Sequence, residues 1–460
     1  MPHKKKLLIV ANRLPMHRAA KGATSKWEIS PGGLVTAMSP ILARHGGSWI
    51  GWPGVAGSAI RPFESGGIHI VPVSLTRKEI ETYYEGFANE TLWPLYHDAI
   101  RAPKFISAWW KPYVDVNWRF ARAAARQAKR GQLVWIHDYH LQLVPRMLRE
   151  LRPDVRIGFF LHIPFPPDEL FAWLPTRCEV LQGILGSDLV GFQTPADVHA
   201  FSRAARRFTS ATGSDSKLRY GDRSVQVGAF PISIDFKSFE SEAKRPATIR
   251  RALDLRRKVG STRKLLLSVD RLDYTKGMDG RLLAFEELLR RKVVTVDDCL
   301  FMQVAVPSRE SVDEYVKMRS HIEAIVGRIN GEFSVPGRVA VHYYRRRLQR
   351  SELVAYYLAA DVMLVTPLRD GMNLVAKEYV STRTANSGVL VLSEFAGAAN
   401  ELTKALLVNP RDIDGMVRVL DTALHLPSPE VKHRMSSLRS QVRRHDVHAW
   451  AEKFFKALER

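Results

Sequence analysis

The residues best suited to bind an anion lie in the stretch Thr366–Tyr379, which reads TPLRDGMNLVAKEY. It follows an apolar run rich in β-branched residues, typical of a buried parallel strand, and Asp370 with Gly371 ends that run before a helix can begin. Free amides at a helix start suit a diphosphate. The pattern predicts that amides bind phosphate, Asp370 binds sugar hydroxyls and Glu378 binds a ribose. A turn aspartate and a surface glutamate on an ordinary helix would give the same pattern.

Two cations form a second candidate phosphate site. Arg271 and Lys276 lie in a loop that follows an apolar run and ends at Gly277. Arginine offers a planar fork of donors and lysine a point charge, so the pair suits a diphosphate leaving group. Arg309 follows the next apolar run and could hold another anionic group. Exposed loop cations that bind no ligand would give the same sequence pattern.

Polar residues also follow two neighbouring apolar runs in the first half. The string His137-Asp138-Tyr139-His140 follows one run and His162 follows the next. Asp138 could accept a hydrogen bond from a hydroxyl, and His162 could donate near a leaving phosphate. A metal site at His137 and His140 is disfavoured, because odd and even positions at a strand end face different sides. We expect core or supporting roles for these two histidines.

Paired glycines follow the first apolar run. Asn12-Arg13 comes directly after that run, and Gly32-Gly33 precedes a helical segment. Paired glycines let a backbone approach phosphate closely, although they more often form a plain turn. The pair is not a GxGxxG motif, so a dinucleotide-dependent oxidoreductase is only weakly supported.

The elements that must position these residues alternate between apolar β-type runs and segments of helical period, which indicates α/β units with parallel strands. In the first half we expect strands at Leu7–Ala11, Ser48–Trp52, Ile68–Val73, Leu133–Ile136, Arg156–Leu161 and Leu189–Phe192, and helices at Leu34–Ala43, Val116–Lys129, Gln142–Glu150 and Pro195–Phe208. In the second half we expect strands at Lys264–Val269, Leu300–Val306, Val339–Tyr343, Val362–Val365, Val389–Leu392 and Leu406–Val408, and helices at Arg281–Arg290, Ser311–Ile329 and Leu374–Thr384. In such sheets ligands bind at the carboxyl ends of the strands, where the candidate residues lie.

The length of 460 residues exceeds what one compact core supports, so about two domains are expected. We place the first at residues 1–233 and the second at 234–445, with a C-terminal helix at 446–460 that packs back on the first domain. No apolar run is long enough to span a bilayer, and the N-terminus lacks a signal-peptide core. Only two cysteines occur, which argues against a disulfide framework. A cytoplasmic enzyme with no membrane partner is the expectation.

The net charge is unusual, since 69 Lys plus Arg against 47 Asp plus Glu give +22. Such a field attracts anions of many kinds. The basic residues are scattered, however, and the densest cluster, Arg345-Arg346-Arg347 with Arg350, has no aromatic stacking platform beside it. Nucleic acid is therefore a disfavoured partner, and a solvated basic surface is the default.

Taken in order, the motifs of this chain resemble glycosyltransferase family 20 from about Leu7 to about Trp450. The matching segments are Asn12-Arg13, Gly32-Gly33-Leu34, Tyr83-Tyr84, Leu92-Trp93-Pro94, and residues 135–139, 160–164, 271–276 and 369–378. The resemblance implies an α/β fold of two tandem Rossmann-like domains that face each other across a cleft, the GT-B type. It also implies transfer of glucose from a nucleoside-diphosphate glucose, usually UDP-glucose, to glucose 6-phosphate, with retention of anomeric configuration and trehalose 6-phosphate as product.

Site residues are carried over by position from the same resemblance. The implied donor side is Gly33, Arg271, Lys276, Asp370, Gly371, Met372, Asn373, Leu374, Val375 and Glu378. The implied acceptor side is Arg13, Tyr84, Trp93, Asp138 and Arg309, with both arginines on the 6-phosphate. His162, Asp138, Arg271 and Lys276 are the implied catalytic residues.

The resemblance also implies retention without a covalent intermediate. No carboxylate in the motifs clearly serves as a nucleophile, so front-face displacement is the expected mechanism. The departing phosphate helps take the acceptor proton, and Arg271 with Lys276 stabilises its growing charge. These cations and the helix amides would do the work of a metal, so neither a metal nor another cofactor is expected.

Two other functions stay open. A relative with the same donor chemistry glucosylates glycerol 3-phosphate, but Arg309 and the complete His137–His140 string favour the hexose phosphate. A non-catalytic regulatory or nucleic-acid-binding protein on this scaffold would explain the charge, yet a degenerate site would be expected to lose residues such as Lys276, Asp370 or Glu378. The base of the donor and a homo-oligomeric state also stay open.

Overall fold

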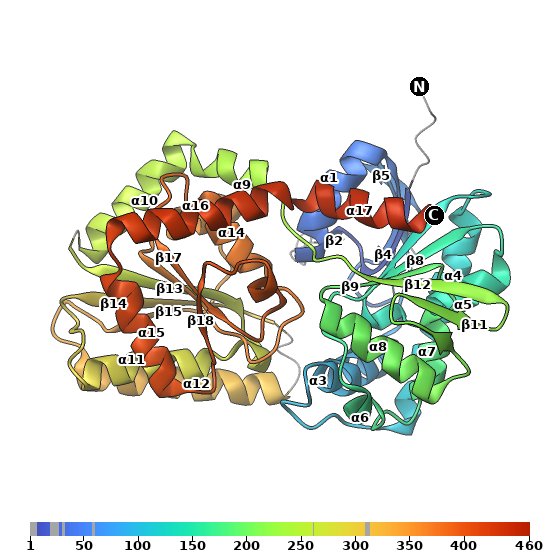
Figure 1. Cartoon of the computed structure of the whole chain (residues 1–460), viewed down its shortest axis with the longest axis horizontal. Coiled ribbons are helices and arrows are strands. Elements are labelled where there is room, and N and C mark those ends of the chain that lie inside the picture. Colours follow the sequence, from blue (N-terminus) through green and yellow to red (C-terminus); the bar gives the residue numbers. More distant parts are fainter. Residues whose placement is uncertain (1–6, 19–26, 30–32, 58–59, 261, 309–312) are drawn as a thin grey trace. The chain divides into compact units, whose positions relative to one another are not determined.

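The computed structural model describes the chain apart from residues 1–6, 19–26, 30–32, 58–59, 261 and 309–312. It forms two compact units, residues 1–232 with 447–460 and residues 233–446. Each unit contains a largely parallel sheet covered by helices (Figure 1). Among the described residues, no helix is long and apolar enough to span a bilayer.

The sheet of the first unit has ten strands in the order β10-β11-β12-β9-β8-β7-β1-β4-β6-β5. Its parallel strands are β1 Leu7–Arg13, β4 Gly47–Trp52, β6 Ile68–Pro72, β7 Leu133–His137, β8 Arg156–Phe160, β9 Leu189–Phe192 and β12 Arg223–Ala229. Antiparallel strands β5 Phe63–Ser65, β10 Thr212–Gly213 and β11 Lys217–Tyr220 close its edges, and β2 Met16–Arg18 pairs with β3 Trp27–Ile29 in a separate ribbon. The central strands are almost continuously apolar and buried, as expected of a sheet covered on both faces.

Helices of the first unit connect and cover these strands. They are α1 Gly33–His45, α2 Arg77–Glu79, the wide-turned helix η1 Ile80–Leu92, α3 Trp93–Tyr96, η2 Ser107–Trp109, α4 Trp110–Gln127, η3 Tyr139–Leu141, α5 Val144–Leu151, α6 Asp168–Phe171, α7 Arg177–Ile184, α8 Pro195–Phe208 and α17 Val447–Leu458.

The second unit has a six-stranded parallel sheet in the order β15-β14-β13-β16-β17-β18. Its strands are β13 Lys264–Arg271, β14 Cys299–Val306, β15 Val341–Tyr344, β16 Val362–Val365, β17 Val389–Ser393 and β18 Leu406–Val408. Its helices are α9 Phe236–Ala243, α10 Pro246–Val259, η4 Tyr274–Lys276, α11 Met278–Arg290, α12 Asp313–Phe333, α13 Arg350–Ala359, α14 Leu374–Thr382, η5 Gly397–Asn400, α15 Ile413–His425 and α16 Ser428–Arg444.

The last helix, α17, packs on the sheet of the first unit. Its Phe454 stacks on Trp135 of β7 with ring centroids 4.5 Å apart. A Cβ atom at Gly158 or Gly191 would lie 2.7 Å from the Phe454 ring, so these strand glycines make room for it. The indole of Trp450 donates to the carbonyl of Phe230 at 3.0 Å. The end of the chain is therefore part of the core of the first unit.

Several element boundaries differ from those predicted. Helix α4 begins at Trp110 instead of Val116, because Tyr113 buries its ring in the core and extends the apolar face toward the N-terminus. Helix α14 ends at Thr382 instead of Thr384. Helix η1 was not predicted, because its Gly86 and Asn89 are poor helix formers. The buried side chains of Tyr83, Phe87 and Leu92 stabilise it in the folded protein.

Candidate functional site

Asp138 follows β7 in a strained backbone conformation. Its φ is +77° and its ψ is 166°, which a non-glycine residue rarely adopts. The amide of Asp138 donates to the carbonyl of Phe160 at 2.8 Å, and its Oδ1 accepts from the amide of His162 at 3.2 Å. The ends of β7 and β8 thus hold Asp138 and His162 together, and strain maintained in this way is typical of a functional site.

The ring of His162 contacts the ring of His137. Nδ1 of His137 and Nε2 of His162 lie 3.0 Å apart, within hydrogen-bonding distance. Burial lowers the pKa of His137 well below its usual range and the pKa of His162 to about 3. Both rings are therefore neutral at neutral pH. His137 was predicted to have a core or supporting role, and the structure places it directly against a predicted catalytic residue.

Arg13 lies at the end of β1 beside two aromatic rings. Its guanidinium carbon is 4.0 Å from the ring centroid of Trp52 and 5.2 Å from that of Tyr84. Tyr84 stacks in turn on His140, with ring centroids 5.7 Å apart. Stacking on aromatic faces fixes a guanidinium while leaving its N–H edge available for an anion such as phosphate.

Two residues missed by the sequence analysis position Arg13. Trp52 supplies the ring under the guanidinium, and a Cβ atom at Gly54 would collide with Nη1 of Arg13. Gly54 also has φ +87°, which favours glycine. The tripeptide Trp-Pro-Gly at the end of a predicted strand was the available signal. Behind Arg13, the buried hydroxyl of Tyr83 donates to Asn12 Oδ1 at 2.8 Å and ties η1 to β1.

Three other predicted site residues are Trp93 and Gly33 of the first unit and Arg309 of the second. Trp93 is buried beside Tyr139 and His97, with ring centroids 5.7 Å and 4.2 Å away. Gly33 is the first residue of α1. Arg309, predicted to bind the acceptor phosphate, lies outside the residues that the structure describes.

In the second unit, Lys276 is paired with Asp370. The Nζ atom of Lys276 lies 2.5 Å from Oδ2 of Asp370, and Asn373 Nδ2 donates to the same oxygen at 3.1 Å. Behind them the buried guanidinium of Arg281 donates to the carbonyl of Lys276 and to Asp270 at 2.8 Å. The loop that follows β13 and the loop that follows β16 are therefore joined by their charged side chains.

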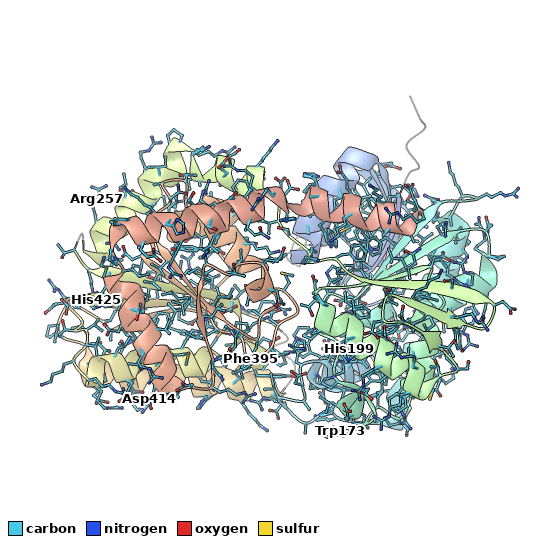
Figure 2. The ribbon with its side chains drawn as sticks, in the orientation of Figure 1. Trp173, His199, Arg257, Phe395, Asp414 and His425 are labelled. Carbon is cyan, nitrogen blue, oxygen red and sulfur yellow. The ribbon has the colours of Figure 1, made fainter. Side chains whose placement is uncertain are left out.

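The segment from Asp370 to Asn373 is held against residues 395–398 by backbone hydrogen bonds. The Asp370 amide donates to the carbonyl of Phe395 at 3.2 Å, and the Ala398 amide donates to that of Met372 at 2.8 Å (Phe395 is labelled in Figure 2). A Cβ atom at Gly397 would collide with the carbonyl oxygen of Gly371. Gly397 was not predicted to be part of the site, because only the folded structure shows this close approach.

Helix α14 begins directly after this segment. Asn373, at φ +82°, is its N-cap, and Asn373 Oδ1 accepts from the amide of Ala376 at 3.2 Å. The amides of Leu374 and Val375 have no acceptor within the helix, since they belong to its first turn. The helix dipole adds positive potential there, so this end of α14 suits an anion.

Glu378 lies one turn further along α14. Its Oε2 accepts from the hydroxyl of Tyr357 at 3.0 Å. Removal of water by the surrounding protein raises the pKa of Glu378 to about 7, against an ordinary value of 4.5. Part of the residue remains accessible. A carboxylate of this kind can accept hydrogen bonds from a diol.

Arg271 ends β13 and is about half exposed. Its guanidinium lies 3.7 Å from Asp273, and 46% of its side chain is accessible. In the described part of the chain, no three His, Cys, Asp or Glu residues are grouped so that they could hold a metal ion.

Residues 5–460 match the sequence profile of glycosyltransferase family 20. The chain is 52% identical to a trehalose-6-phosphate synthase from Mycolicibacterium smegmatis, over 98% of this chain and 92% of that protein. It is 51% identical to one from Mycobacterium avium, over 98% of this chain and 94% of that protein. Both comparisons agree with the resemblance seen in the motifs.

Solved structures match the fold over nearly the whole chain. One is an alpha,alpha-trehalose-phosphate synthase (UDP-forming) from Burkholderia xenovorans in complex with glucose-6-phosphate, with 35% identity, a TM-score of 0.90, and coverage of 99% of this chain and 100% of that one. Another, from E. coli, is bound with UDP-2-fluoro glucose and has 35% identity, a TM-score of 0.90 and 99% coverage of each chain. The predicted α/β class with two parallel-sheet domains is confirmed.

Proposed function

The chain belongs to glycosyltransferase family 20, and we infer that it is an alpha,alpha-trehalose-phosphate synthase. It transfers glucose from UDP-glucose to glucose 6-phosphate with retention of configuration and yields trehalose 6-phosphate. The 52% identity with named trehalose-6-phosphate synthases over 98% of the chain carries this conclusion. Solved relatives bound to glucose-6-phosphate and to UDP-2-fluoro glucose support the choice of acceptor and donor.

The donor is assigned to the second unit. The free amides at the start of α14 and the cations Lys276 and Arg271 bind the diphosphate, and Glu378 accepts from the ribose hydroxyls. In the structure Lys276 is paired with Asp370 at 2.5 Å. A diphosphate would compete for this ammonium, which would leave Asp370 able to accept from the glucose hydroxyls.

The acceptor is assigned mainly to residues of the first unit. Arg13, which lies against the ring of Trp52 and near that of Tyr84, binds the 6-phosphate, and Trp93 completes the acceptor side. Arg309, which belongs to the second unit, is the other residue proposed for the 6-phosphate. Asp138 accepts from a hydroxyl of the incoming sugar. His162, whose amide is bound to Asp138, contacts the donor glucose near the reacting carbon.

Chemistry follows from positioning and charge. As the bond between the anomeric carbon and the diphosphate breaks, Lys276, Arg271 and the α14 amides stabilise the growing negative charge. The acceptor hydroxyl attacks from the same face and gives its proton to the departing phosphate, so configuration is retained. These groups supply the positive charge that a metal would otherwise provide, and we expect activity to survive excess EDTA. We place the reaction in the cytoplasm.

The decisive experiment is a matrix of substrates with products identified by mass. UDP-, GDP- and ADP-glucose are each combined with glucose 6-phosphate and with glycerol 3-phosphate. The expected result is fastest transfer from UDP-glucose to glucose 6-phosphate. A preference for glycerol 3-phosphate would reassign the acceptor. No transfer at all, with tight duplex binding that weakens steeply as salt rises, would replace the enzyme by a nucleic-acid-binding protein.

A further inference from the structure

The buried contact between His137 and His162 has no role in the reaction as described above. Its relevance to the reaction rests on the proposed function only through the role given to His162. His137 is the last residue of β7, and it pairs in register with Phe160, the last residue of the parallel strand β8. His162 follows shortly after, and the two imidazoles meet at 3.0 Å between Nδ1 of His137 and Nε2 of His162. His137 is fully buried, whereas His162 remains partly accessible.

The backbone of His162 is already fixed from both sides. Its amide donates to Asp138 at 3.2 Å, and its carbonyl accepts from Nε2 of Gln193 at 3.3 Å. Gln193 is held in turn by the amide of Ile232, which donates to its Oε1 at 2.9 Å. These contacts do not fix the rotation or the protonation of the imidazole. Among the residues that the structure describes, His137 is the side chain hydrogen-bonded to that ring.

Two neutral imidazoles share one hydrogen in such a contact, so one ring donates and the other accepts. If His162 donated from Nε2, the proton of His137 would sit on its own Nε2, which is buried and has no hydrogen-bond partner among the described residues. Nε1 of Trp135, in the same cluster 4.6 Å away between ring centroids, is likewise buried and unpaired within the described residues. Donation by His162 would therefore add a second unpaired N–H donor, that of His137, to this aromatic cluster. Buried N–H groups without a partner are rarer in proteins than buried acceptors without one.

We propose that His137 is a positioning residue that sets the tautomer of His162: Nδ1–H of His137 donates to Nε2 of His162, which keeps the proton of His162 on Nδ1. The Nδ1–H of His162 is then the group left to donate a hydrogen bond to the sugar donor. A histidine with the opposite tautomer would present a lone pair there, and it could not donate to an oxygen of the substrate.

Three substitutions separate this role from packing. His137→Asn keeps a donor near the Nδ1 position, so we expect kcat within a few-fold of wild type. His137→Leu fills similar space without a donor, and we expect kcat to fall about 10- to 100-fold, the range of one unmade buried hydrogen bond. His137→Asp can only accept, so it should drive the His162 proton to Nε2 and lower kcat further, and it replaces the leucine variant if that protein does not fold.

The tautomer itself is read by 15N NMR of histidine-labelled protein without substrate, with the His162 signal identified by its loss in His162→Gln. We expect Nδ1–H in the wild type and in His137→Asn, and Nε2–H in His137→Leu. The control is His199→Leu on the surface of α8 (Figure 2), which removes an imidazole bound to Asp215 at 2.7 Å and should change neither readout.

A wild-type His162 protonated on Nε2 would overturn the proposal, as would equal kcat values for the asparagine and leucine variants. Because the NMR measurement needs no substrate, it decides the tautomer even if the substrate matrix shows no transfer. Failure of the proposed function and failure of this inference are therefore distinguishable.

Discussion

Glu378 shows how a binding residue can weaken the folded state. Its pKa is raised by burial from 4.5 to about 7. The folded state therefore holds this proton more tightly than the unfolded chain, so the stability present below pH 4.5 is lost as pH rises through 7. We predict that Glu378→Gln, which stays neutral, raises the free energy of unfolding at pH 8 by about 3 kcal/mol, and changes it little at pH 4.5. Thermal melts at both pH values measure the difference.

The same carboxylate should control donor binding. Because the charged form accepts more strongly from the ribose hydroxyls, the KM for UDP-glucose is expected to fall as pH rises through 7 in the wild type. Glu378→Gln should have a higher donor KM that no longer changes in this range, with the KM for glucose 6-phosphate unaffected. A wild-type donor KM that is flat between pH 6 and 8 would contradict the ribose role.

Arg13 is held by stacking as well as by charge, which lysine cannot reproduce. We predict that Arg13→Lys raises the KM for glucose 6-phosphate about tenfold or more and leaves the donor KM unchanged, because lysine has neither the planar fork nor the flat face that lies 4.0 Å from Trp52. Initial-rate kinetics with each substrate varied give both constants. Arg122→Lys is the matched control: this exposed arginine lies 5.5 Å from the ring of Trp118 and should be replaceable without effect. An equal rise in both KM values would argue against an acceptor role.

At the scale of elements, the donor loop depends on the close approach of η5. A Cβ atom at Gly397 would collide with the carbonyl oxygen of Gly371, which is backbone and cannot rotate away. We predict that Gly397→Ala displaces the segment before α14, raises the donor KM at least tenfold and lowers Tm, a cost of about 1–3 kcal/mol for an overpacked site. The control is Gly331→Ala in α12, where an added Cβ meets nothing within 4 Å and should be neutral or stabilising. A normal donor KM in Gly397→Ala would show that the loop does not rely on this contact.

Local pattern was sufficient where one strand or one turn decides the structure. The buried run of β16 and the break at Asp370-Gly371 predict a helix that starts at Leu374, and α14 begins there. The pairing of Lys276 with Asp370 was not predictable, because 94 positions separate the two residues. Trp52 under Arg13 and Gly397 against Gly371 were missed for the same reason. Each depends on backbones that only the tertiary fold brings together, and a sequence pattern records spacing along the chain and not these distances.

At the scale of the whole chain, the first unit is completed by residues from the far end of the sequence. Helix α17 covers the strands that carry His137 and His162, and Trp450 lies 6.4 Å from the ring of His162. Trp135 of β7 packs on Phe454 of the same helix. The C-terminal helix is therefore connected to the candidate site through a continuous aromatic cluster, and its loss should affect both stability and turnover.

We predict that Phe454→Ala lowers the free energy of unfolding by about 3–5 kcal/mol, since Phe454 is fully buried and its loss leaves a cavity beside Gly158 and Gly191 that cannot close. We also expect kcat to fall more than either KM changes, because the cavity loosens the strand ends that orient His162 while leaving the phosphate-binding residues in place. The measurements are chemical denaturation and initial rates, with Lys456→Ala on the same helix as the control. If Phe454→Ala were as stable as the wild type, α17 would not be part of the core of the first unit. If it lost stability but kept its kcat, the cluster would support the fold without orienting His162.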